Sequence, residues 1–338
     1  LSAETGGQNN VAIGVNTLLA QVNSSGNIYN TAVGSQAGKA VTTGTFNTLI
    51  GGLAGDALTD ADFNVAVGTT ALTSDTLGSK STALGHAALT TQNFTTATDT
   101  YNTAVGWAAG SAITTGQQNT LVGAQAGDAL TDGGENVAVG YNALSTEDGN
   151  GRNVAIGNSA LTTLNAGATG NNTAVGYGAG ASATTGLRNV FVGQSAGVTA
   201  TTMEDSVAVG NDAGKFATTA NNSVFIGSNA GQGITGAKLN GNNNVVIGES
   251  AGVIIQDSAS GNTLIGQGCA AALTTAADNV IIGISAGSNV TTGGGNIIIG
   301  NSDGEAATAA HQIIMGNGVN GVGQDDFTFG RGGLDCNI

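Results

Sequence analysis

The stretch Asn102-Thr-Ala-Val-Gly106 is followed 17 residues later by Asn119-Thr-Leu-Val-Gly123, and 17 residues after that by Asn136-Val-Ala-Val-Gly140. This five-residue motif occurs 18 times between residues 10 and 316, most often at that spacing. A repeat this short cannot bury a core alone, so each copy has to stack on its neighbours. The sequence therefore predicts an all-β solenoid, a parallel β-roll of about 18 coils.

The composition of the motif predicts the structure of one coil. Asn opens 14 copies, Ser three and Gln one, while position 2 is β-branched, position 4 aliphatic or Met, and position 5 Gly. Such a run is typical of a short strand that meets a turn. Ala-Gly or Ala-Leu and often Thr-Thr-Gly follow, so we expect a strand, a turn, a second short strand and a return loop. Stacked Asn amides should hydrogen-bond in a ladder.

Position 3 predicts an association between chains. It is Ala in nine copies and large and apolar in the other nine. Strand neighbours face opposite sides, so if positions 2 and 4 face the interior, position 3 faces outward and needs a cover. A homotrimer is the simplest compact arrangement of slender rolls. Its predicted seam consists of Leu49, Leu121, Phe191, Phe225, Val246, Leu264, Ile281, Ile298 and Ile314.

The repeats also predict how the chain is organised. Residues 1–9 are expected to be the edge of a longer chain, 10–316 the repeat array, and 317–338 a degenerate C-terminal rung and tail. Within that tail, Asp326-Phe-Thr-Phe-Gly330 reads as a last imperfect rung. Longer return loops recur every fourth coil and divide the array into the blocks 30–101, 102–171, 172–243 and 244–316.

The charge balance and the cysteines exclude several classes of function. The net charge is −15, and the seven basic residues are scattered, so no patch is expected to bind nucleic acid. No apolar run approaches the roughly 20 residues that span a bilayer, so membrane insertion is not expected. Cys269 and Cys336 have no metal or redox spacing, and Cys269 is expected to pack in the core.

Few residues suit catalysis, and no catalytic residue, cofactor or metal is predicted. The chain has two histidines, His86 and His311, which we interpret as ordinary surface residues. Loop acids recur in matching coils and are interpreted as solvated charge. Calcium binding and a carboxylate pair for glycan hydrolysis remain alternatives for them. These acids are Asp56, Asp60, Asp62, Asp128, Asp132 and Glu135.

One column of residues is a candidate binding surface. The residue after the motif Gly is Trp107, Tyr141 and Tyr177 in three coils, each two coils from the next. Exposed aromatic rings at regular steps suit stacking on sugar rings. These three residues form a candidate glycan-binding column, and the alternative is a chance placement of surface aromatics.

The phrases Asn172-Thr-Ala-Val-Gly-Tyr-Gly-Ala-Gly180 and Asn119-Thr-Leu-Val-Gly-Ala-Gln-Ala-Gly127 resemble two related groups of repeats. One group forms the YadA-like heads of trimeric autotransporter adhesins, and the other forms the Asn-Thr-Ala-Val-Gly arrays of bacteriophage tail fibres. The resemblance covers about residues 10–316 and implies a left-handed β-roll in a homotrimer. These coils are longer than typical adhesin repeats and contain Thr-Thr-Gly loops, which brings them closer to the phage arrays.

The resemblance implies a structural, non-enzymatic role in host attachment. The chain is expected to be a rod of a phage tail fibre on the virion surface, with other tail or fibre proteins and a host cell-surface glycan or protein as partners. The alternative is the head of a bacterial trimeric autotransporter adhesin on the cell surface. Two further alternatives are an ice-binding solenoid, for which the Thr columns look interrupted at Leu58-Thr59, and a glycan-degrading tailspike.

Overall fold

The computed structural model describes residues 7–22, 26–167, 169–303, 307–321, 323–331 and 336–337. It is all-β and forms a parallel β-solenoid of about 18 coils roughly 17 residues apart, so the predicted fold class is confirmed at this level. The chain divides into two compact units, Leu1–Asn171 and Asn172–Ile338.

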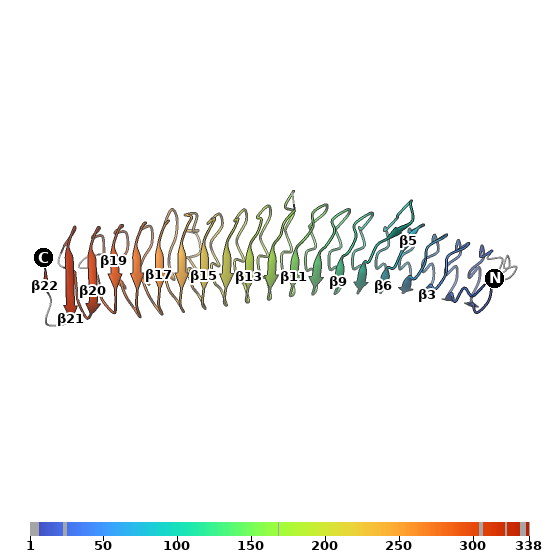
Figure 1. Ribbon diagram of the computed structural model, residues 1–338, viewed down its shortest axis with the longest axis horizontal. Coiled ribbons are helices and arrows are strands. Elements are labelled where there is room, and N and C mark those ends of the chain that lie inside the picture. Colours follow the sequence, from blue (N-terminus) through green and yellow to red (C-terminus); the bar gives the residue numbers. More distant parts are fainter. Residues whose placement is uncertain are drawn as a thin grey trace. The chain divides into compact units, whose positions relative to one another are not determined.

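In the first unit, the strand of each described coil pairs in parallel with the strand of the next (Figure 1). The pairing is in phase with the motif, since Ala104 lies opposite Leu121 and Val105 opposite Val122. Two shorter strands, β5 (Gly78–Ser79) and β7 (Thr98–Asp99), pair with each other beside a long return loop. The stacked strands are β1 (Val11–Ile13), β2 (Thr31–Val33), β3 (Thr48–Ile50), β4 (Val65–Val67), β6 (Thr82–Leu84), β8 (Thr103–Val105), β9 (Thr120–Val122), β10 (Val137–Val139) and β11 (Val154–Ile156).

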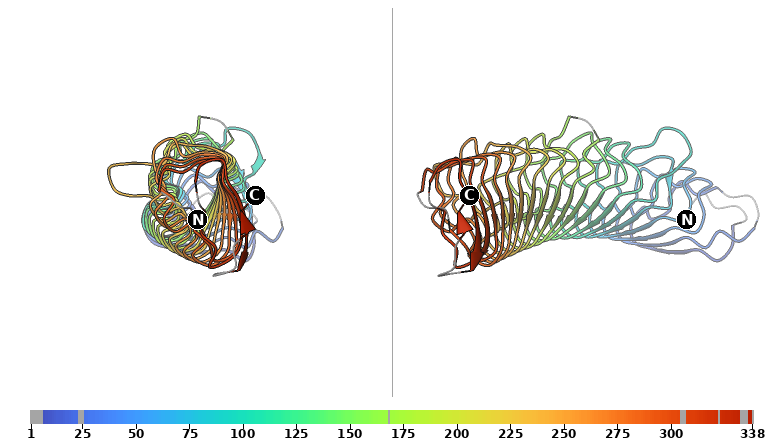
Figure 2. Two further views of the ribbon diagram at one scale, coloured as in Figure 1. Left: turned by 90° about the vertical axis from the view of Figure 1, so that its left-hand side faces the viewer. Right: turned by 60° about the vertical axis from the view of Figure 1, so that its left-hand side comes forward.

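The second unit repeats this arrangement, and longer loops extend from some of its coils (Figure 2). Its stacked strands are β12 (Thr173–Val175), β13 (Val190–Val192), β14 (Val207–Val209), β15 (Val224–Ile226), β16 (Val245–Ile247), β17 (Thr263–Ile265), β18 (Val280–Ile282), β19 (Ile297–Ile299) and β20 (Ile313–Asn317). The imperfect last rung is confirmed as β21 (Phe327–Arg331), which pairs in parallel with β20. Strand β22 (Cys336–Asn337) then pairs antiparallel with β21 and covers part of its edge.

The prediction of a second short strand in each coil is wrong. The segment after the motif Gly is a succession of turns, because at least two of its residues adopt positive φ in each of the 16 coils whose motifs begin at residues 10 to 279. Gln36, at φ 61°, and Gly38, at φ 58°, show this in one coil. An extended strand requires negative φ throughout. The turns still bind the next coil, since the Gly38 N–H donates to the Ala54 carbonyl at 2.9 Å.

The predicted seam is also wrong, because position 3 of the motif faces the interior of the coil and positions 2 and 4 face outward. Leu49, Leu121 and the other position-3 residues of the predicted seam are completely buried inside a single chain. Positions 2 and 4 face outward instead; Ile50 and Leu84, both at position 4, are 39% and 44% exposed. Alternation along a strand defines two faces but does not say which one is the interior. We call the side chains at positions 2 and 4 the outward columns.

The interior is narrow, and its packing explains why position 3 is so often Ala. Glycines in the turn segment leave room for large position-3 side chains. A Cβ on Gly55 would lie 2.8 Å from Leu49 Cδ2, and a Cβ on Gly197 would lie 2.4 Å from the Phe191 ring. Where that turn residue is Leu, as at Leu72, position 3 of the same coil is the small Ala66, and both are buried. In these coils a large residue at one of the two positions is therefore matched by a small residue at the other, which keeps the narrow interior closely packed.

The Asn residues stack in register and are buried, as the ladder requires, but most of their bonds go to the backbone. Asn30 Oδ1 accepts the Asn47 N–H of the next coil at 2.8 Å. Asn47 Nδ2 donates to the Ala61 carbonyl of its own return loop at 2.8 Å. Amide-to-amide bonds occur as well, as between Asn279 Nδ2 and Asn262 Oδ1 at 3.0 Å. An Asn with these bonds joins strand, loop and next coil, and its buried amide is satisfied.

Candidate functional site

The candidate glycan-binding column lies on the surface, at the first turn residue after the strand. In the first unit, Trp107 and Tyr141 are 53% and 50% exposed. Ala124 lies between them in the stack, because the Gln125 N–H donates to the Trp107 carbonyl and the Asn142 N–H to the Ala124 carbonyl. The two rings are therefore separated by one coil, with only a methyl group between them. His86 precedes Trp107 in the same column and is exposed.

Tyr177 occupies the same coil position in the second unit. Its side chain is 61% exposed, and its carbonyl accepts the Ser195 N–H of the next coil at 2.9 Å. The next column member there is Gln194. The three predicted aromatics thus share one structural position and are all available to solvent. Among the residues that the structure describes, none of the three rings stacks on another aromatic ring.

A second aromatic column was missed by the sequence reasoning. Tyr29, Phe46 and Phe63 each stand immediately before the motif Asn and stack on one another in consecutive coils. Ring centroids are 5.5 Å apart for Tyr29 and Phe46, and 5.0 Å apart for Phe46 and Phe63. Reading the residue that precedes each motif as a further column would have found them. We call these three residues the aromatic ladder.

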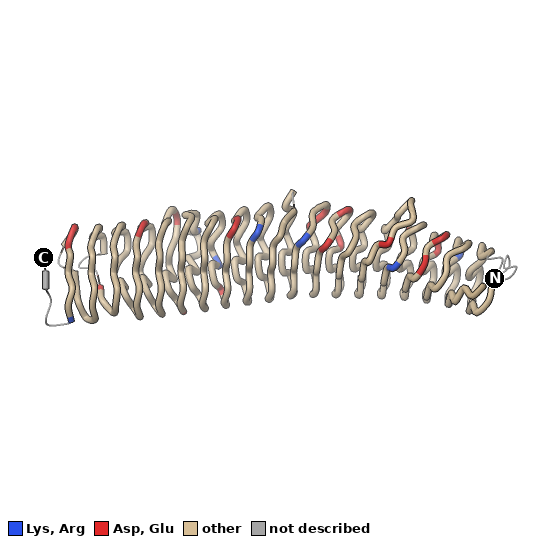
Figure 3. Tube along the Cα trace, viewed as in Figure 1, with Lys and Arg blue, Asp and Glu red and all other residues tan. Residues whose placement is uncertain are grey.

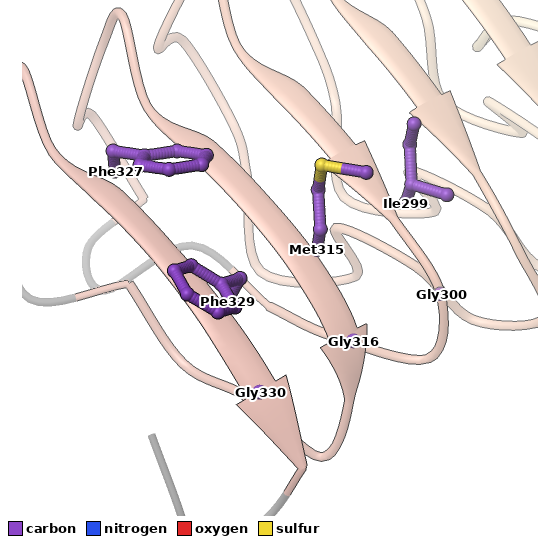
Figure 4. Close-up of a pocket in the computed structure, with 7 residues that line it drawn as sticks. All are labelled: Ile299, Gly300, Met315, Gly316, Phe327, Phe329 and Gly330. Carbon is purple, nitrogen blue, oxygen red and sulfur yellow. The ribbon is translucent and has the colours of Figure 1, made fainter. Parts of the chain in front are cut away.

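The outward columns form a surface on the strands of both units that is aliphatic or Met at position 4, and Val, Ile or, in seven coils, Thr at position 2. In the second unit this surface widens into an open hollow of about 730 Å³ on β19 to β21 (Figure 4). Ile299, Met315 and Phe329 line it from position 4, beside Phe327 and the glycines of three coils. The exposed apolar members of the columns are Val11, Ile13, Ile50, Val65, Leu84, Val122, Ile156, Ile226, Ile297, Ile299, Ile313, Met315 and Phe329.

The loop acids hold neighbouring coils together. Asp62 Oδ1 accepts the Thr45 N–H at 2.6 Å, and Asp60 accepts the Thr43 hydroxyl. Glu135 pairs with Arg152 of the next coil at 2.9 Å. Charged positions are scattered along the coils of each unit (Figure 3). Within the described part of the chain, no group of three or more His, Cys, Asp or Glu residues is arranged to hold a metal ion.

Two acids that the sequence reasoning did not single out are buried. Asp75 and Glu147 are completely buried at a coil position where neighbouring coils carry Leu58 and Leu130. Asp75 accepts hydrogen bonds from the Gln92 amide and from the Gly78 and Phe94 N–H groups, at 2.6, 3.0 and 3.0 Å. Burial raises the pKa of both carboxyl groups.

Their geometry makes them anchors for loops. Glu147 Oε1 accepts from Asn150 Nδ2 at 2.7 Å, and its Oε2 accepts the Ala166 N–H at 3.4 Å. Asp75 and Glu147 each reach a backbone N–H 19 residues further along, in the next coil. Because protein groups already surround each carboxylate, neither is presented to a substrate.

The cysteines and His311, which the sequence analysis also considered, occupy ordinary positions. The Cys269 thiol is buried and donates to the Ile281 carbonyl at 3.2 Å, and burial raises its pKa to about 12. This confirms the packed core thiol. The side chain of Cys336 lies outside the described residues. His311 Nδ1 lies 3.2 Å from Asp325 Oδ1, and both side chains are well exposed.

The Thr column is less interrupted than the sequence suggested. Thr42 is paired with Thr59 and not with Leu58, since its N–H and its hydroxyl both donate to the Thr59 carbonyl. Thr59 donates in turn to the Thr76 carbonyl at 3.0 Å. Each hydroxyl proton is therefore used to bind the next coil.

Comparison with known proteins identifies no relative. No protein-family model, no curated protein and no solved structure matches this chain. Across the described residues, there is no helix of the length and apolarity needed to cross a membrane.

Proposed function

We propose that this chain is a structural host-attachment rod of a phage tail fibre, assembled as a homotrimer of left-handed β-rolls on the virion surface. It acts by display, holding a receptor-binding tip or its own surface away from the particle, and the proposal includes no catalysis. The observation that carries it is the outward columns, which recur in coil after coil of both units. The motifs that resemble phage fibre repeats support the same function.

The outward columns support association of chains. A stripe of exposed Val, Ile, Leu and Met side chains of this kind marks an interaction surface in a soluble protein. Copies of one chain that share such a stripe can cover it by closed rotational symmetry about the stacking axis. A three-fold arrangement brings three stripes together around one axis. The partners in this proposal are two further copies, other tail or fibre proteins, and a host-surface glycan or protein.

The association predicts a defined mass in solution. Light scattering of the purified chain is expected to give three times the 32.5 kDa of one chain, at all concentrations down to the micromolar range. The physical reason is that each monomer would otherwise expose its outward columns to water. A folded, soluble monomer in the same measurement would contradict the proposed assembly.

The aromatic column supports glycan recognition. Trp107, Tyr141 and Tyr177 are each at least half exposed at one coil position, and exposed aromatic rings suit stacking on sugar rings. Replacing all three by Ala is expected to lower binding to host cells or to a glycan array by at least tenfold, because a trimer presents three such columns and gains avidity. Replacing Ile284, which is 63% exposed at the same coil position, by Ala is the matched control. Equal binding by a folded triple variant would place recognition elsewhere on the fibre.

The bacterial adhesin head is the second candidate, favoured by the same motif resemblance. Fractionation distinguishes the two. Mass spectrometry of purified phage particles is expected to detect peptides of this chain together with tail proteins. Detection in an outer-membrane fraction of uninfected bacteria, and not in particles, would favour the adhesin head instead.

A further inference from the structure

The aromatic ladder has a geometry that the glycan-binding column lacks. Tyr29, Phe46 and Phe63 stand in three successive coils, and their ring planes differ by 24° and 3°. Tyr29 covers one face of the Phe46 ring and Phe63 covers the other. Phe46 is nevertheless 43% exposed. Because both faces are occupied, the part of the Phe46 ring that meets solvent is its edge.

The backbone indicates that these rings are not placed for burial. All three residues adopt left-handed conformations, with φ between 55° and 58°, which bulky side chains disfavour at a cost of about 1 kcal/mol or more each. Core packing offers no compensation, since Tyr29 and Phe63 are also about half exposed. Asn occupies the same coil position at Asn222 and Asn243, with φ of 54° and 62°. Polar residues are therefore compatible with this position, and three consecutive aromatics are not required by the fold.

Ring edges select a different ligand from ring faces. An aromatic ring is electropositive at its edge and electronegative on its face, so an edge attracts the π face of another ring. A sugar stacks its C–H groups on a ring face, and those faces are occupied inside the ladder. A flat aromatic ligand that lies across the three edges can make edge-to-face contacts with all three rings at once.

The charged residues around the ladder determine which sign of charge on a ligand is favoured. Asp60 is exposed and Asp62 half-buried in the segment that leads to Phe63. The nearest base in the column is Lys80, which is already paired with Asp99 and lies over the Tyr101 ring, 5.3 Å from its centroid. With a net charge of −15 on the chain, this surface favours a cation.

We propose that the aromatic ladder is a binding site for elongated, planar aromatic compounds that join an electron-rich ring to a positively charged group, and that lie along the stack with the electron-rich π face across the ring edges. The site involves other residues than the glycan-binding column and the outward columns. It therefore does not depend on the proposed host-attachment function.

Titration of the purified chain with thioflavin T, a planar dye that joins an electron-rich dimethylaminophenyl ring to a cationic benzothiazolium group, tests the site. Saturable fluorescence enhancement with one site per chain is expected. Phe46→Asn should weaken binding at least tenfold, because it removes the central ring while keeping a residue that tolerates the backbone. Phe46→Tyr, which keeps a ring, should bind as the unmodified chain does, and so should Gln118→Asn at the same position of a coil outside the ladder. An anionic dye, anilinonaphthalene sulfonate, should show no change that depends on Phe46.

Circular dichroism is expected to show that Phe46→Asn keeps the fold, so that a loss of dye reports on the ladder. Unchanged thioflavin T affinity in a folded Phe46→Asn variant would overturn the proposal. A change in assembly mass on light scattering, without a change in dye affinity, would overturn it as well and identify the ladder as a contact between copies.

Discussion

Leu121→Asp is expected to unfold the chain locally or prevent its folding, whereas Val122→Asp should leave a folded chain that no longer assembles. Leu121 is completely buried within one chain, where a carboxylate has no partner, and such a charge costs about 3–5 kcal/mol. Val122, one residue later, lies in an outward column and is 36% exposed in the isolated chain. A charge there is solvated in the monomer and is buried only if copies associate.

Circular dichroism melting and light scattering on the two variants separate these effects. Val122→Ala is the matched control, and it should keep both fold and assembly because it adds no charge. If Leu121→Asp instead gave a folded monomer with unchanged melting temperature, the inward position of that residue would be wrong. If Val122→Asp assembled as the unmodified chain does, the outward columns would not be the contact between copies.

Gly51→Ala is expected to be strongly destabilising, while Gly52→Ala, at the adjacent residue, should have little effect. Gly51 has φ 137°, and a Cβ on it would lie 2.5 Å from the Gly68 carbonyl oxygen of the next coil. Backbone strain alone is worth about 1–3 kcal/mol, and the overlap with a main-chain atom adds to it because the coil spacing is set by strand pairing. A Cβ on Gly52 would lie 4.0 Å from the Ser35 carbonyl oxygen, which is an ordinary contact distance.

Thermal unfolding of the two variants measures the difference directly. Gly51→Ala should lower the melting temperature by several degrees or more, and Gly52→Ala should stay close to the unmodified chain. The same close approach recurs at other motif glycines; a Cβ on Gly106 would lie 2.4 Å from the Gly123 carbonyl oxygen. Equal melting temperatures for both variants would show that the stacked coils can separate locally without loss of stability.

Much of this fold can be read from the period of the sequence. A 17-residue repeat with a β-branched run and a fixed Gly places one strand in each coil, and the observed register matches the motif residue by residue, as in Ala138 opposite Ala155. The buried Cys269 and the last rung at Phe327 also follow from their places in the repeat. These features depend on local preference and on in-phase stacking, which a periodic sequence expresses directly.

Other features depend on which atoms surround a residue, and the period does not contain that information. Positions 3 and 4 are both apolar in every motif, so alternation could not show that Leu121 points inward and Val122 outward. The narrow interior determines which position points inward. Large position-3 side chains fit there because the facing turn residue is Gly, which has no Cβ to clash with them. In the same way, the aromatic ladder arises from the parallel stacking of three consecutive coils.

By itself, then, the sequence determined the coil, its strand, its register and the need for both faces of the strand to be apolar. The tertiary structure alone decided which face is the core, which aromatic rings meet one another, and that Asp75 and Glu147 are anchored inside the coils. The physical reason is that periodicity reports spacing along the chain. Burial and contact depend on the distance between coils and on the shape of the interior that they enclose.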